Sequence, residues 1–127
     1  LLKQRPDYAS LEDALDEAVQ MVIKSKRIVY HLYRSADRAL VEMYLMRICE
    51  QVILSYIHDN RSDLPISQED KTIIVRYYKC QCFGMIIDWL NSDMRFDIAA
   101  EARRMYELRK GMLEEIVRRA SMQRSKA

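Results

Sequence analysis

Histidine and cysteine are the residues of this chain that could hold a metal ion, and their spacing argues against it. The two histidines, His31 and His58, are preceded three positions earlier by isoleucine and serine, not by the carboxylate that a di-iron helical bundle places there. Cys80 and Cys82 are two positions apart, which on a helix directs them about 200° from each other, so they cannot chelate zinc as a Cys-x-x-Cys turn does. We therefore expect no metal site and no cofactor.

Nucleophilic and phosphate chemistry has no recognisable motif either. The sequence contains no glycine-rich phosphate loop and no nucleophile elbow, and its two glycines leave little material for such turns. His31 lies between Tyr30 and Tyr33 and could hydrogen-bond a ligand, although a histidine satisfied within or beside the core is the simpler alternative. We expect no catalytic residue, and a helical-bundle enzyme is the least supported hypothesis.

Tyrosine and methionine, at eight each, are more informative. Methionine makes adaptable apolar walls, and tyrosine supplies an apolar ring with a polar tip, so together they suit a small organic ligand. The alternative for each residue is ordinary packing in the core. The candidate lining residues of a ligand pocket are Tyr30, His31, Tyr33, Met43, Tyr44, Met46, Tyr56, Tyr77 and Cys80.

The helix predicted from Ser67 to Ser92 organises the chain. Its second half, Cys80 to Leu90, is apolar nearly all the way round at helical spacing, so it requires partners on most faces. Ser67 and Asp70 fit a capping box at its start, and a breaker cluster of Asn91, Ser92 and Asp93 ends it.

The remaining pattern predicts an all-α fold of about five helices. Apolar residues recur at steps of three and four after a cap at Ser10, and a basic cluster near Lys24 to Arg27 interrupts them. The short segment Ile28 to Tyr33 permits strand or helix, and its helical neighbours favour helix. The next helix runs from Ser35 to about Ile57, a loop follows from His58 to Ile66, and Asp97 caps a last helix that extends to about Ala120.

Composition predicts one folded domain spanning residues 1–127. Half of the residues are hydrophobic and the net charge is only +2, which is too small for binding nucleic acid or a membrane surface by charge alone. No apolar run reaches the roughly 18 to 20 residues of a membrane span. Three cysteines are no disulfide framework, so we expect a reducing, cytoplasmic location in which they act as small hydrophobic residues.

Both glycines fall inside predicted helices. A glycine in mid-helix costs about 1 kcal/mol relative to alanine, so something should compensate for it. Gly84 lies in the organising helix and Gly111 in the last helix, and neither is expected to serve as a turn. The flanking Phe83, Met85 and Met112 favour a packed crossing, so we predict that two backbones approach closely at these positions; the alternative is a tolerated glycine that faces solvent.

The stretch Phe83-Gly84-Met85-Ile86-Ile87-Asp88-Trp89-Leu90-Asn91-Ser92-Asp93-Met94 resembles the penultimate helix of TetR-type transcriptional regulators. The order Phe-Gly, Ile-Ile, Trp-Leu is its diagnostic part, and it is most similar to the Firmicutes-type C-terminal domain of that family. The resemblance extends from about Tyr77 to Leu113, and upstream it consists only of helix order and size. It implies an effector-binding and dimerisation domain whose last two long helices form a four-helix bundle with those of a second copy.

The family's helix-turn-helix module normally precedes this domain, and the residues before Tyr8 are too few to form it. The resemblance therefore implies a homodimer that binds a small apolar or aromatic effector and reaches DNA only through an N-terminal domain outside this chain. The alternative is a headless helical adaptor that dimerises or binds a protein partner without an effector. One short chain also has too few helices to cover Cys80 to Leu90. The candidate dimer-interface residues are Phe83, Gly84, Ile87, Trp89, Leu90, Met105, Leu108, Gly111, Met112 and Ile116.

Overall fold

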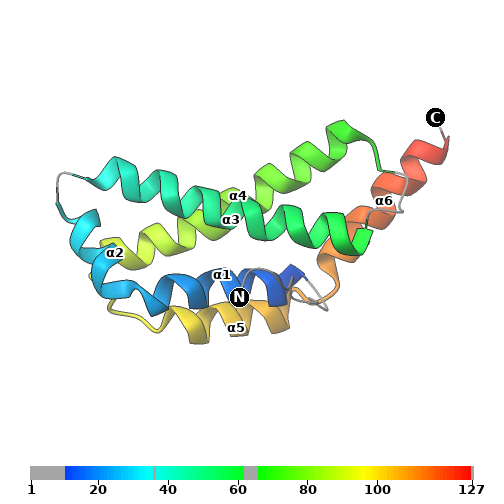
Figure 1. Ribbon diagram of the computed structural model, residues 1–127. Coiled ribbons are helices and arrows are strands. Elements are labelled where there is room, and N and C mark those ends of the chain that lie inside the picture. The colour runs from blue at the N-terminus through cyan, green and yellow to red at the C-terminus, as the bar shows by residue number, and fades with distance from the viewer. Residues whose placement is uncertain (1–10, 36, 62–65, 127) are drawn as a thin grey trace.

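The computed structural model consists of helices joined by short connections (Figure 1). It describes residues 11–35, 37–61 and 66–126, apart from the side chains of residues 11, 12, 58–61 and 123–126. Within those residues there is no strand, which confirms the all-α class, and there are six helices where about five were expected. They are α1 (Leu11–Lys24), α2 (Lys26–Tyr33), α3 (Arg38–Arg61), α4 (Gln68–Asn91), α5 (Ile98–Leu108) and α6 (Met112–Lys126).

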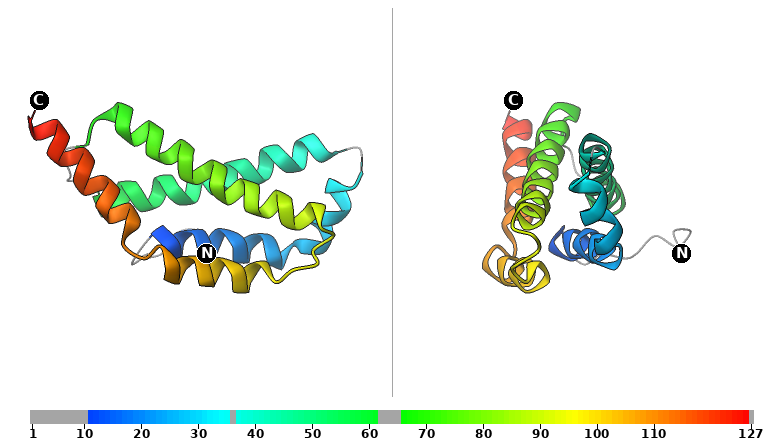
Figure 2. Two further views of the ribbon diagram at one scale, coloured as in Figure 1. Left: turned by 180° about the vertical axis from the view of Figure 1, so that it is seen from behind. Right: turned by 90° about the vertical axis from the view of Figure 1, so that its left-hand side faces the viewer.

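The helices form two layers. α1, α2 and α3 make one layer, and α4, α5 and α6 make the other, as the right-hand view of Figure 2 shows. α3 and α4 cross over each other, and α1 packs on both α3 and α5. Among the described residues, no helix combines the length and the apolar character that crossing a membrane requires.

Two predicted helix starts are confirmed. The Ser67 hydroxyl accepts a hydrogen bond from the Asp70 backbone N–H at 3.0 Å, and the Asp97 carboxylate accepts one from the Ala100 N–H at 3.1 Å. Each satisfies an amide that the first helical turn leaves without an internal partner. The cap predicted at Ser10 lies outside the described residues.

Some other boundaries differ from the prediction. α1 and α2 separate at Ser25, inside the basic cluster, and the segment that permitted strand or helix is helical. α3 begins at Arg38, and the Ser35 hydroxyl instead accepts a hydrogen bond from the Asp37 N–H at 3.2 Å. α3 then continues to Arg61, beyond the end expected near Ile57.

The last helix is not continuous, which corrects the prediction of one helix from Asp97 to about Ala120. It breaks after Leu108 and resumes at Met112, because Gly111 has a φ of +88°, a left-handed conformation that glycine adopts at no steric cost. Gly111 is therefore a turn residue, contrary to expectation, and gives α6 a different direction from α5.

The close approach predicted at Gly84 does not occur within the chain. A Cβ placed there would have no neighbouring atom within 4 Å, and the residue is exposed. The neighbouring side chains that enter the core lie on the opposite side of α4, which leaves this side of the backbone bare.

The core lies between the two layers. α4 contributes Ile74, Val75, Tyr78, Cys82, Ile86, Trp89 and Leu90, all buried. Trp89 also donates a hydrogen bond from Nε1 to the Phe96 carbonyl at 3.0 Å, which fixes the chain after α4. Trp89 and Leu90 are 4% and 0% exposed, so two of the candidate interface residues belong to the chain's own core.

Candidate functional site

The outer side of α4 carries an apolar stripe that the rest of the described chain leaves largely exposed. Its members follow one another at alternating steps of four and three residues, the spacing by which one helix packs along another. Ile73 and Tyr77 are 54% and 60% exposed, and Ile87 is half-buried. We call this stripe the α4 seam; it consists of Ile73, Tyr77, Cys80, Gly84 and Ile87.

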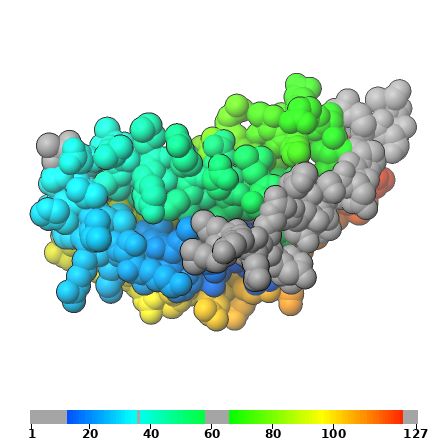
Figure 3. All heavy atoms as spheres, in the orientation of Figure 1, coloured from blue at the N-terminus to red at the C-terminus, as the bar shows by residue number. Residues whose placement is uncertain are grey.

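Three exposed apolar residues belong to the same layer as the α4 seam. Met105 and Leu108 on α5 and Met112 at the start of α6 are between 41% and 60% exposed. The left-hand view of Figure 2 faces this layer, with α4 in front of α3. From the opposite side, α1 to α3 hide most of α4 (Figure 3). The α4 seam and these three exposed residues therefore belong to the same layer of helices.

A cavity of about 80 Å³ lies beside the seam, between α1, α4 and α5. Its walls are mainly apolar, with one acid, one base, one amide and one thiol among them. Pockets for drug-sized ligands occupy about 300–1,000 Å³, so this cavity is small. The lining residues are Leu15, Asp16, Gln81, Cys82, Met85, Ala102, Met105 and Arg109.

The polar groups of the cavity interact through Arg109. Its guanidinium donates a hydrogen bond to Gln81 Oε1 and lies 5.7 Å from the centre of the Tyr78 ring. The pKa of the Cys82 thiol is lowered by a hydrogen bond with Cys49 and by the positive charge of Arg109. Asp16 Oδ1 is buried without a hydrogen-bond partner among the described residues.

A second depression, of about 230 Å³, lies between α3 and α4. It is more polar, and the Lys79 ammonium lies 3.4 Å from the Glu50 carboxylate within it. Its lining residues are Glu50, Leu54, Gln68, Lys71, Thr72, Val75, Arg76 and Lys79.

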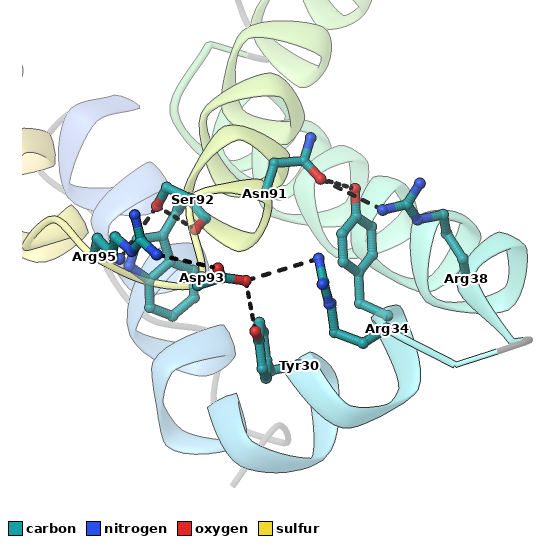
Figure 4. Close-up of polar contacts among 9 residues, drawn as sticks. Tyr30, Arg34, Arg38, Asn91, Ser92, Asp93 and Arg95 are labelled. Carbon is teal, nitrogen blue, oxygen red and sulfur yellow. Dashed lines mark hydrogen bonds and ion pairs between the residues drawn. The ribbon is translucent and has the colours of Figure 1, made fainter.

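Polar contacts join the C-terminal end of α4 to α2 and α3 (Figure 4). The buried Tyr33 hydroxyl donates to Asn91 Oδ1 at 2.8 Å. Arg38 lies with its guanidinium carbon 4.2 Å from the centre of the Tyr33 ring and its Nη2 3.5 Å from the same Asn91 oxygen. One amide oxygen thus joins α2, α3 and α4.

The turn after α4 makes a second set of contacts there. Asp93 has a φ of +61°, and its Oδ1 accepts a hydrogen bond from the Tyr30 hydroxyl at 2.6 Å. Arg34 and Arg95 each lie 3.7 Å from the Asp93 carboxylate. The Tyr30 hydrogen bond is the main reason that the pKa of Asp93 is lowered, and the same bond raises the pKa of Tyr30. We call these contacts of Tyr30, Tyr33, Arg34, Arg38, Asn91 and Asp93 the α2–α4 junction.

None of the predicted pocket residues lines either cavity described above. Tyr30 and Tyr33 belong to the α2–α4 junction, and Tyr56 is buried with its hydroxyl 3.1 Å from Glu114 Oε2. Met46 is half-buried. The exposed members are His31, Met43, Tyr44, Tyr77 and Cys80, of which the last two lie on the α4 seam.

The residues that do line the first cavity include three polar groups that the sequence did not single out as binding residues: Asp16, Gln81 and Arg109. Gln81 had a detectable signal, since it is one of two strongly polar residues within an otherwise apolar helical stretch. Nothing in the sequence distinguishes Asp16 from other charged residues on an amphipathic helix. Only the packing of α5 beside α1 makes it part of the cavity wall.

The comparison with protein families gives one match. A TetR C-terminal family model, described as the C-terminal region of transcriptional regulators, matches residues 9–111. That span contains α1 to α5 and ends at the break before α6. No curated protein and no solved structure matches the chain.

Proposed function

Because the chain belongs to the family of TetR-type transcriptional regulator C-terminal regions, we propose that it is the dimerising, effector-responsive domain of a cytoplasmic regulator. It pairs with a second copy through the α4 seam. A small molecule bound among its helices changes the geometry of the pair. DNA is bound by a helix-turn-helix domain outside these 127 residues, and the role of this chain is regulatory, not catalytic.

The observation that carries the proposal is the α4 seam. A stripe of Ile73, Tyr77 and Ile87 at helix-packing spacing is unfavourable in water and is suited to burial against another helix. Gly84 adds to this, because the bare backbone at an exposed position allows a second helix to approach closely. A two-fold axis through the seam would make the same stripe meet itself.

The revised interface follows from burial. Phe83, Gly84, Ile87, Met105, Leu108, Met112 and Ile116 keep surface for a partner, and we add Ile73, Tyr77 and Cys80. Trp89 and Leu90 are omitted because they are buried. Gly111 is exposed but is also omitted, because the turn between α5 and α6 already explains why a glycine occurs there. A permanent interface of this kind is expected to bury about 2,000 Å² or more.

The cavity between α1, α4 and α5 is where we place the effector. A drug-sized apolar molecule requires more room than this cavity offers, so binding it would require α1 and α5 to move away from α4. α5 carries Met105 and Leu108 toward the proposed interface, so such a movement changes the pairing surface. The effector then acts by favouring one of two arrangements that the dimer already populates.

Sedimentation equilibrium tests the pairing with two isoleucine variants. Ile73→Asp places a charge in the seam and should leave a folded monomer at micromolar concentration, because a buried unpaired carboxylate opposes association. Ile28→Asp is the matched control: Ile28 is 66% exposed on α2, away from the seam, and this variant should remain a dimer. Wild-type protein that stays monomeric, or equal behaviour of the two variants, would refute the proposed interface.

Gly84→Leu sharpens the same test. The single chain has room for a side chain at this position, so the variant should fold. Its dimer should weaken, because overpacking costs typically 1–3 kcal/mol per site and each site occurs twice in a two-fold dimer. A leucine variant that dimerises as well as wild type would show that the helices do not cross at Gly84.

A thermal-shift screen of apolar and aromatic compounds tests the effector. A ligand that binds only the folded state adds about 2.7 kcal/mol at a hundredfold excess over its dissociation constant, which raises the melting temperature. Met85→Trp, at a half-buried residue that lines the cavity, should fill the cavity and abolish the shift, whereas Met43→Trp, at an exposed residue on α3, should not. A screen in which no compound raises the melting temperature would count against the effector and would favour the alternative of a dimeric adaptor without one.

A further inference from the structure

One buried oxygen at the cavity between α1, α4 and α5 lacks the partner that its chemistry requires. Asp16 on α1 lines this cavity, and its Oδ1 is buried without a hydrogen-bond partner among the described residues. Buried polar atoms in folded proteins nearly always have a partner, because an unpaired one has lost its water without any replacement. This exception therefore requires an explanation of its own.

The base on the same wall does not neutralise this acid. Arg109 donates a hydrogen bond to Gln81 Oε1 and lies 5.7 Å from the centre of the Tyr78 ring. No ion pair joins Arg109 to Asp16 in the part of the chain that the structure describes, although both residues line the cavity. The Asp16 carboxylate is thus left without a cation beside it.

The rest of the wall is suited to a short apolar chain. Leu15 comes from α1, Met85 from α4, and Ala102 and Met105 from α5. About 10–15 Å³ of such space holds one water molecule, so a cavity of about 80 Å³ has room for several non-hydrogen atoms. A ligand with a short aliphatic chain therefore fits beside Asp16 without any movement of the helices.

The carboxylate can also be reached from outside the core. Oδ1 is buried, but Asp16 as a whole is only half-buried. A charged group can therefore approach the carboxylate without first crossing the apolar interior, where the loss of water is costly for a charge.

We propose that the cavity binds a small aliphatic ammonium ligand, with its nitrogen at the Asp16 carboxylate and its carbon chain against Leu15, Met85 and Met105. An ammonium group supplies both the N–H donor and the positive charge that this carboxylate lacks. A hydrogen bond between two charged groups is about twice as strong as one between neutral groups. An alcohol supplies only the donor, and an anionic ligand is repelled by the carboxylate.

This inference names the chemical class of the effector. That the ligand acts as an effector rests on the proposed function, whereas its binding does not. Met105 lines the cavity and is also 41% exposed in the same layer as the α4 seam, so the ligand contacts a residue of the proposed dimer interface. Met105 lies one turn before the end of α5 at Leu108, close to the turn that sets the direction of α6.

Three probes with the same carbon chain test the charge: n-butylamine, n-butanol and butyrate. n-Butylamine is protonated at pH 7, as the lysine amine is. At equal ionic strength it should raise the melting temperature of the 127-residue chain saturably, n-butanol should raise it less, and butyrate should not raise it. An equal shift with n-butanol, or no saturable shift with n-butylamine because only water occupies the cavity, would overturn the proposal.

Asp16→Asn and Glu17→Gln locate the binding site. Each variant removes one carboxylate from α1 at nearly constant size, but Glu17 is exposed and does not line the cavity. Asp16→Asn should weaken n-butylamine binding about tenfold to a hundredfold, which is what the loss of a hydrogen bond to a charged group costs. Glu17→Gln should bind as wild type does. Equal affinities of the two variants would show that the amine binds elsewhere.

Asp16→Leu gives a readout that needs no ligand. It removes the unpaired buried oxygen and adds apolar atoms at the cavity, so it should melt at a higher temperature than wild type and should not respond to n-butylamine. A lower melting temperature would show that the carboxylate stabilises the free chain, which contradicts the proposal. Sedimentation with saturating n-butylamine tests the proposed function separately: unchanged association would refute the effector role and leave the binding site intact.

Discussion

The α4 seam and the α2–α4 junction occupy the same helix and differ in what completes them. Along the seam, Ile73 and Tyr77 leave more than half of their surface in water. One step beyond its last member, the same spacing reaches Asn91, whose oxygen accepts from Tyr33 and lies near Arg38. The junction forms its contacts within one chain, whereas most of the seam is exposed.

Because of this difference, contacts that stabilise the single chain can be distinguished from contacts that hold two copies together. Contacts at the junction fix α4 to α2 and α3 in every copy, so their loss should affect unfolding at any protein concentration. In the dimer that we propose, contacts along the seam are made with a second copy, so their loss should appear only through association, which depends on concentration.

The largest expected effect contrasts the two faces of α4 at adjacent isoleucines. Ile74 is 8% exposed and Ile73 54% exposed. Ile74→Ala should cost about 2–5 kcal/mol in the free energy of unfolding, because it leaves a cavity in the core. Ile73→Ala should stay within about 0.5 kcal/mol of wild type for the single chain. Urea unfolding at several protein concentrations measures both, and a concentration-independent loss for Ile73→Ala would contradict the proposed seam.

A smaller effect is expected at the junction from removing one partner of the Tyr33–Asn91 hydrogen bond. Asn91→Ala leaves the buried tyrosine hydroxyl without its acceptor and should cost about 1–3 kcal/mol. Tyr33→Phe removes the donor and leaves the exposed amide to water, so it should cost about 0.5–1.5 kcal/mol. Denaturant unfolding measures the loss of unfolding free energy in each variant. A larger loss for Tyr33→Phe than for Asn91→Ala would contradict the expectation that the tyrosine hydroxyl left without its acceptor is the costlier defect.

The smallest effect is a pH dependence carried by the exposed Tyr30–Asp93 pair. The pKa of Asp93 is lowered from 3.8, so its contribution is present above pH 3.8 and is lost as pH falls through the lowered value. The pKa of Tyr30 is raised from 10.0, so its contribution is present below pH 10.0 and is lost as pH rises through the raised value. Tyr30→Phe should flatten the melting temperature at both ends of the pH range, and an unchanged profile would contradict these assignments.

Local features of the structure could be predicted from the sequence. The caps at Ser67 and Asp97, the break within Lys24 to Arg27 and the end of α4 at Asn91 all follow from residues within a turn or two of the feature. Helical periodicity established the all-α class for the same reason, since hydrogen bonds and side-chain spacing repeat within a few residues. The family resemblance also followed from one continuous stretch of sequence, Phe83 to Met94.

Only the tertiary structure decided which side of each helix faces the core. Cys80 to Leu90 is apolar nearly all round, so its sequence does not show that Trp89 and Leu90 are buried while Cys80 and Gly84 are exposed; that depends on where α3 and α5 lie. The sequence pattern predicts that Gly111 is helical, whereas its φ of +88° in the structure shows that it is a turn residue. The cavity around Asp16 and Arg109 joins helices that are distant in sequence, and only the packing of the helices brings such residues together.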